Sequence, residues 1–79
     1  MLQLKEVGDV TIEGEKHTIY VSPVFTLLKT GNKFTLHRFV NPGGTDYSAI
    51  YDDAGEEIGS VHREREYDMI LNYMYTYDC

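Results

Sequence analysis

The sequence predicts an α+β fold, an antiparallel β-meander of about five or six strands with a C-terminal helix packed on the sheet. Two observations lead to this fold class. Short runs rich in β-branched and aromatic residues, separated by turn residues, fill most of residues 2–61. Residues 63–77 carry apolar side chains at helical spacing. With 79 residues in all, we expect one small domain spanning residues 1–79.

The first hairpin is expected near the N-terminus. Residues 2–7, 10–12 and 18–21 alternate or cluster as β-formers, and Gly14-Glu15-Lys16 separates the last two runs. Glycine followed by polar residues is typical of a turn between strands. We therefore predict that the chain reverses at residues 14–16.

Residues 22–40 predict a second hairpin. Residues 24–28 are expected to pair with residues 34–40 across a turn in which Gly31 or Asn32 adopts positive φ. The alternative is a short helix over residues 22–30, with Ser22 as its cap and Pro23 at its first position. The β-branched and aromatic content of the segment favours the strand.

A third hairpin is expected after the loop at residues 41–45, where a proline and two glycines interrupt the β-pattern. Tyr47, Ala49 and Tyr51 alternate along its first strand. The acidic segment 52–57 turns the chain, and residues 58–61 return. Three successive hairpins predict an antiparallel meander.

The C-terminal segment fits two patterns. As a helix, it places Tyr67, Ile70, Leu71 and Met74 on one side. As a strand, it places every second residue from Tyr67 onward on one face, and tyrosine favours sheets. We favour the helix, because its opening residues are good helix formers and the sheet needs a layer to cover its apolar face.

The predicted helix has more apolar surface than one sheet can cover. Met69, Tyr73 and Tyr77 form a second row beside the main stripe, so the apolar arc spans about 240°, where a helix on one sheet needs little more than about 100°. One interpretation is that these tyrosines are half-buried, or that strands wrap around the helix. The other is that Met69, Tyr73 and Tyr77 are exposed and bind a partner or a second copy of the chain.

Charge is unevenly distributed along the chain. Residues 1–45 carry five Lys and Arg against four Asp and Glu, whereas residues 46–79 carry nine Asp and Glu against Arg63 and Arg65. The net charge is thus +1 in the first part and −7 in the second. An acidic surface repels phosphate backbones and attracts basic protein surfaces. We expect a protein with a basic surface as the partner, and no direct nucleic-acid binding.

The acidic turn is the first candidate contact surface. Asp52, Asp53, Glu56 and Glu57 gather at the predicted hairpin tip. The segment lacks the spacing of a calcium loop, because Ala54 stands where a ligand is needed. The remaining interpretations are a solvated hairpin tip and a patch that binds Lys and Arg of a partner.

No pattern in the chain predicts catalysis, a metal or a cofactor. His17, His37 and His62 lie on three different predicted strands, without the spacing of a metal site. Cys79 is the single cysteine and stands at the end of the chain. We therefore expect a protein that is not an enzyme. The chain also lacks a membrane-spanning apolar run and a signal-peptide pattern, so we expect no membrane contact and a cytoplasmic location.

These expectations favour a small acidic protein-binding module. Small, acidic, tyrosine-rich chains without motifs are similar in character to inhibitors that phages and mobile elements encode against host defence or transcription machinery. We expect such a module to occlude a basic, nucleic-acid-binding surface of its partner. A homodimer through the C-terminal helix and a structural subunit of a larger assembly are further interpretations.

The alternative from another class is a small β-rich nucleic-acid-binding protein. In that case bases would stack on Tyr47, Tyr51, Phe34 or Phe39. The positive groups would come from the more basic part of the chain, namely Lys29, Lys33, His37 and Arg38.

Overall fold

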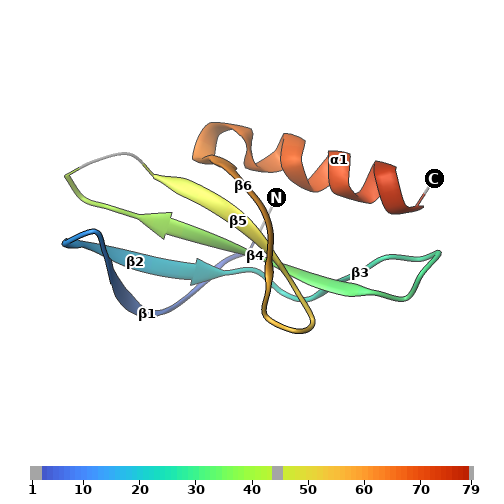
Figure 1. The fold of residues 1–79 in the computed structure, drawn as a ribbon, viewed down its shortest axis with the longest axis horizontal. Helices are drawn as coiled ribbons and strands as arrows, with labels where there is room; N and C mark the ends of the chain where they lie inside the picture. The colour runs from blue at the N-terminus through green and yellow to red at the C-terminus, as the bar shows by residue number, and fades with distance from the viewer. Residues whose placement is uncertain (1–2, 44–45, 79) are drawn as a thin grey trace.

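The computed structural model describes residues 3–43 and 46–78, without the side chains of residues 77 and 78. All strand pairs are antiparallel in the sheet order β1-β2-β4-β5-β6, with β3 also paired with β4. The helix α1 lies on one side of this sheet (Figure 1). The predicted α+β class, with its antiparallel sheet and packed C-terminal helix, is confirmed. The elements are β1 (Lys5–Ile12), β2 (Glu15–Val21), β3 (Phe25–Thr26), β4 (Lys33–Val40), β5 (Tyr47–Asp52), β6 (Glu57–His62), a 3-10 turn η1 (Arg63–Arg65) and α1 (Glu66–Asp78).

The first hairpin differs from the prediction in two details. The predicted break between residues 7 and 10 is wrong, because β1 continues through Gly8 with a bulge after Glu6. Gly8 has a φ of 147°, which glycine adopts without strain. The tight turn is Glu13-Gly14, whose φ values of 52° and 81° are both positive, as in two-residue hairpin turns. Residues 15 and 16, predicted in the turn, therefore begin β2.

The segment after β2 is a strand, but a shorter one than predicted. β3 has two residues, and Phe25 pairs with Phe34 at the start of β4. Between β2 and β3, the Ser22 N–H donates to the Leu36 carbonyl at 2.9 Å, and the Ser22 Oγ accepts from the Leu36 N–H at 2.9 Å. Pro23 has no N–H to continue the ladder. The proline thus shortens the strand, and the helix alternative for residues 22–30 is wrong.

The turn before β4 forms where it was predicted. The Leu27 N–H donates to the Asn32 carbonyl and the Gly31 N–H donates to the Leu27 carbonyl, each at 2.8 Å. Gly31 has a φ of 75°, a conformation that glycine adopts with less strain than other residues. The turn also buries Leu27 against the core, with 1% of its surface exposed.

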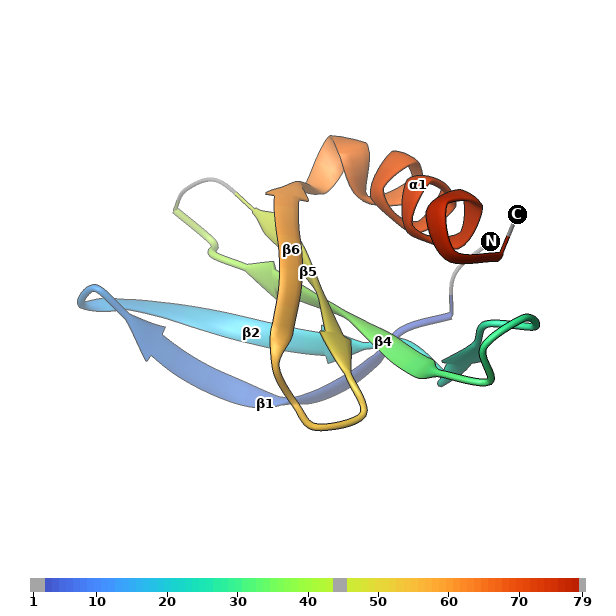
Figure 2. The same cartoon turned by 45° about the vertical axis from the view of Figure 1, so that its right-hand side comes forward.

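The hydrophobic core lies between α1 and one face of the sheet (Figure 2). Alternation along β4 and β5 directs Phe34, Leu36 and Ile50 to this face, where they meet Leu27 and Ile70. No helix of the described residues covers the opposite face. It holds the other half of the alternating side chains of the same strands, and these are mainly aromatic rings.

Candidate protein-interaction surfaces

The acidic hairpin is held in shape by one of its own carboxylates. Asp52 Oδ1 accepts hydrogen bonds from the N–H groups of Ala54 and Glu56, each at 2.9 Å. The Asp52 N–H donates to the Glu56 carbonyl at 3.0 Å, and Gly55 turns the chain with a φ of 81°. Asp52 is therefore a structural part of the turn, and its carboxylate is fixed in place.

Glu57 has a local role as well. It pairs with Tyr51 across the hairpin and forms a side-chain hydrogen bond with it. Burial raises the pKa of Tyr51, and the negative charge of Glu57 raises it further. Asp53, Glu56 and Glu57 are exposed. Of these three, Asp53 and Glu56 stand at the tip of the hairpin.

The carboxylates of the acidic hairpin form no ion pair with another described residue. Ion pairs within residues 3–43 and 46–78 are Lys16 with Asp9, Arg63 with Asp46, and Arg38 with Glu66. None of the three involves residues 52–57. The structure thus gathers four negative charges on one hairpin without neutralising them by an ion pair among the described residues.

A cleft joins the acidic hairpin to the helix. It has a volume of about 420 Å³ and lies where the tip of the β5–β6 hairpin, the turn before β4 and the side of α1 face one another. Asp52 and Asp53 provide carboxylates, while Ile58 and Tyr73 provide apolar walls. The acidic hairpin and Tyr73 of α1, which are far apart in the sequence, therefore line one cleft. The full lining is Asn32, Lys33, Asp52, Asp53, Ala54, Ile58 and Tyr73.

The rotation of α1 about its axis is set by a buried ion pair. Glu66, the first residue of α1, has 7% of its surface exposed. Its carboxylate accepts a hydrogen bond from Ser48 Oγ at 2.6 Å and two from Arg38, one of them at 3.1 Å. Both partners stand on the sheet face below the helix. Because Ile70 and Met74 lie on the same side of the helix as Glu66, this pair directs them to the core.

The electrostatics of Glu66 reflect this network. Burial by itself raises the pKa of a carboxyl group, but the hydrogen bonds from Arg38 and Ser48 and the charge of Arg38 oppose it. The net result is a pKa of Glu66 below its ordinary value. The carboxylate is therefore charged and paired at neutral pH.

The buried side of the helix matches the prediction in part. Ile70 and Met74 face the core as predicted. Met69 and Tyr73 are half-buried against the same core, and Tyr73 meets the Phe34 ring edge to face at 4.9 Å. The half-buried interpretation of these two residues is therefore confirmed, and the interpretation that they are exposed is wrong. Their predicted partner-binding role is untested, and the side chain of Tyr77 lies outside the described residues. The displaced residues Tyr67 and Leu71, predicted to face the core, are exposed. Glu66 explains the change, because its row must face Arg38.

An exposed apolar row results from this rotation. Tyr67, Leu71 and Tyr75 have 50%, 57% and 73% of their surface exposed. The sequence indicated that apolar surface would exceed what the sheet can cover, but it did not indicate which row would remain outside. The missing signal was the pairing of Glu66 with Arg38, which are 28 residues apart.

The sheet face opposite α1 carries a line of rings across β4 and β5. Phe39 stacks on Tyr47 with centroids 4.7 Å apart, and His37 lies 4.2 Å from Tyr51. Tyr47 also meets His17 edge to face at 6.2 Å. Burial lowers the pKa of His37. The rings cover one another, so Phe39 is only 6% exposed.

All three histidines belong to this face by register. His17, His37 and His62 stand on β2, β4 and β6, the three different strands that were predicted. In the part of the chain that the structure describes, no three histidine, cysteine, aspartate or glutamate side chains are close enough together to hold a metal ion. His62 also caps the η1 turn, since its Nδ1 accepts from the Glu64 N–H at 3.5 Å.

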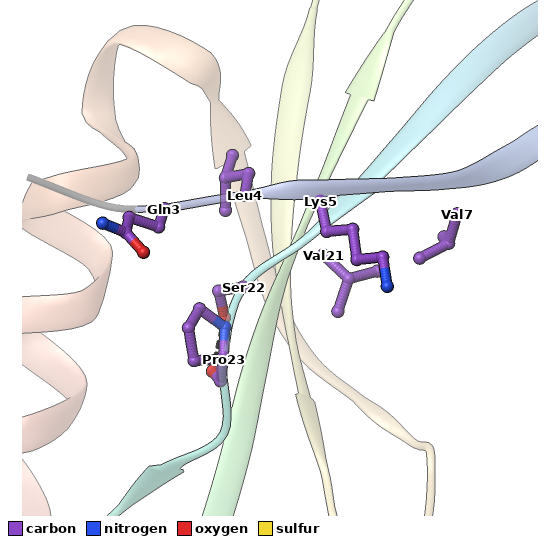
Figure 3. A pocket seen from close by; sticks show the side chains of 7 residues that line it. All are labelled: Gln3, Leu4, Lys5, Val7, Val21, Ser22 and Pro23. Atoms are coloured by element: carbon purple, nitrogen blue, oxygen red, sulfur yellow. Dashed lines mark hydrogen bonds between the residues drawn. The ribbon is translucent and has the colours of Figure 1, made fainter.

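A second concave region lies at the start of β1 (Figure 3). It is a groove of about 420 Å³ between the N-terminal segment and the end of β2 with the residues that follow it. Its walls are mainly apolar, and Lys5 is its one charged residue. No local sequence pattern indicates this groove, because its two sides come from separate segments. The lining residues are Gln3, Leu4, Lys5, Val7, Val21, Ser22 and Pro23.

No helix formed by the described residues has the length and apolar character needed to cross a lipid bilayer.

Comparison of the chain with protein-family models, curated proteins and solved structures finds no match.

Proposed function

We propose that this chain is a small acidic protein-binding module that occludes a basic surface of a partner protein. The observation that carries the proposal is the acidic hairpin, whose four carboxylates have no ion-pair partner among the described residues. Negative charges that no described cation neutralises, on a fixed turn, attract Lys and Arg and increase the rate of association. The function is therefore binding rather than catalysis.

The cleft beside the hairpin suggests how one basic side chain is received. An arginine or lysine stem would lie between Ile58 and Tyr73, and its charged end would meet the carboxylates of Asp52 and Asp53. Lys33 at the same cleft limits how many positive charges can enter. A partner surface that normally binds an anion such as nucleic acid would be blocked by steric and electrostatic occlusion.

Binding of a labelled oligo-lysine peptide, measured by fluorescence anisotropy, tests the location of the acidic contact. We expect Glu56→Lys with Glu57→Lys to slow association and to weaken binding, and raised salt to weaken it in the unaltered protein. The matched control is Glu6→Lys with Glu13→Lys, which changes the net charge equally at two exposed residues elsewhere. Equal effects of the two pairs, or binding that salt does not change, would contradict the proposal.

A second candidate is nucleic-acid binding, which the ring line on the uncovered face favours. Tyr47, Tyr51 and His37 are half-buried there and retain some exposed surface. However, Phe34 is buried in the core and Arg38 is committed to Glu66. We expect no gel shift with single-stranded or duplex probes at low salt. A shift that is lost on Tyr47→Ala with Tyr51→Ala would establish this candidate instead.

A further inference from the structure

We infer that the exposed row of α1, formed by Tyr67, Leu71 and Tyr75, is a docking strip for an apolar strip flanked by lysines or arginines on a partner protein. The inference rests on the proposed function. It adds an apolar contact through α1 to the electrostatic contact through the acidic hairpin.

The geometry of α1 separates this row clearly from the buried ones. Residues four apart lie on the same side of a helix. The row that begins at Glu66 and the row of Met69 and Tyr73 both face the core. The remaining two rows face outward. One is the apolar row of Tyr67, Leu71 and Tyr75, and the other is the polar row of Asp68, Asn72 and Thr76.

The exposure of the row is large for its residue types. Leu71, at the centre, is 57% exposed, and tyrosines flank it on both sides at 50% and 73%. Tyrosine presents a large apolar ring with a polar end, and it is enriched at protein interfaces. A leucine between two tyrosines on a rigid helix is thus suited to fill apolar depressions of a partner.

Charge decides between a basic partner and a second copy of the chain. Asp68, on the polar row beside the strip, and Glu64, in the preceding η1 turn, carry exposed carboxylates. Arg63, in the same turn, pairs with Asp46 at 2.9 Å. Two copies packed through this strip would bring together molecules that each carry a net charge of −6, and this charge opposes their association. A partner with lysines or arginines beside its apolar strip would complement Glu64 and Asp68.

Two probe peptides separate the apolar contribution from the charge contribution. One is a synthetic amphipathic peptide of leucine and lysine, and the other is an oligo-lysine of equal length. The test variant is Leu71→Ser with Tyr75→Ser, and its matched control is Asn72→Ser with Thr76→Ser on the neighbouring row. Circular dichroism checks that both variants keep the helix.

We expect the test variant to bind the leucine-lysine peptide about tenfold more weakly. Its binding of oligo-lysine should be unchanged, and the control should bind both peptides as the unaltered protein does. Unchanged binding of the leucine-lysine peptide by the test variant would overturn the inference. A dimer in sedimentation equilibrium that dissociates on Leu71→Ser would also overturn it, because the strip would then be covered by a second copy.

The hairpin variant Glu56→Lys with Glu57→Lys distinguishes this inference from the proposed function. If the proposed function holds, that variant weakens binding of both peptides. If the binding of both peptides is unchanged in that variant, the hairpin proposal fails. In that case the binding of the leucine-lysine peptide by the variant Leu71→Ser with Tyr75→Ser still shows whether the strip is a docking site.

Discussion

The two faces of the sheet protect their apolar side chains in different ways. The face under α1 packs Phe34, Leu36 and Ile50 against the helix, and the ion pair between Arg38 and Glu66 crosses the layers. The described residues form no second layer over the opposite face. Its rings instead lie side by side across neighbouring strands, with polar edges that reach water.

This difference indicates where substitutions should change the stability most. Burial of apolar surface between two layers supplies most of the free energy of folding in a small domain. Rings that cover one another on an open face contribute less, because part of each remains hydrated. We therefore expect substitutions on the covered face to have larger effects than those on the open face.

The largest effect is expected from Phe34→Ala. Phe34 has 2% of its surface exposed and contacts both Phe25 and Tyr73 through its ring. Its removal leaves a cavity and should lower the free energy of unfolding by about 4 kcal/mol. Urea denaturation followed by circular dichroism measures this loss. A loss below about 1 kcal/mol would show that the two faces do not differ as described.

A smaller effect is expected from Glu66→Gln. The substitution leaves the Arg38 guanidinium without its charged partner in a mostly buried position. We expect a loss of about 2 kcal/mol in the free energy of unfolding, below the usual range for fully buried pairs because the Arg38 side chain is 20% exposed. Glu64→Gln, at an exposed position, is the control and should have almost no effect. Equal effects of the two variants would contradict the assigned role of Glu66.

The same carboxylate predicts a response to acid. The folded-state pKa of Glu66 lies below its ordinary value of 4.5, so its contribution to stability is present above that pH. The contribution is lost as the pH falls below 4.5 and through the folded-state pKa. The unfolding free energies of the native protein and Glu66→Gln should therefore converge in acid. A constant difference between them would contradict this prediction.

The open face should respond to pH in a different range. Burial lowers the pKa of His37 below its ordinary value of 6.5, so protonation favours the unfolded chain. Its contribution to stability is complete above pH 6.5 and decreases as the pH falls through that value towards the folded-state pKa. His37→Gln should remove this part of the pH dependence. Urea denaturation at several pH values measures it, and an unaltered dependence would exclude His37 as its source.

The smallest effect is expected from Tyr51→Phe, which removes the hydrogen bond to Glu57 but keeps the ring. Glu57 is exposed, so water replaces the lost partner, and we expect a change of about 0.5 kcal/mol or less. Thermal denaturation is a sufficient measurement. A loss as large as that of Glu66→Gln would show that the open face depends on polar contacts as strongly as the covered face does.

Local sequence patterns predicted the turns and most of the strands, but they left residues 22–30 and 63–77 compatible with either a strand or a helix. Glycines mark the turns at Gly14, Gly31 and Gly55, where positive φ is needed, and alternation or helical spacing identifies the segments between them. The acidic hairpin was also evident, because its four carboxylates are neighbours in the chain. Such features depend on residues close together in sequence, so a local pattern is enough to reveal them.

Which surfaces face outward depends on contacts between residues distant in sequence. The pairing of Arg38 with Glu66 sets the rotation of α1, and this half-buries Met69 and leaves Leu71 exposed. Strand register brings the three histidines to one face, and the packing of α1 on the sheet places Tyr73 beside the acidic hairpin. In each case the cause is a contact between residues distant in sequence, and the apolar spacing of the helix is compatible with more than one rotation.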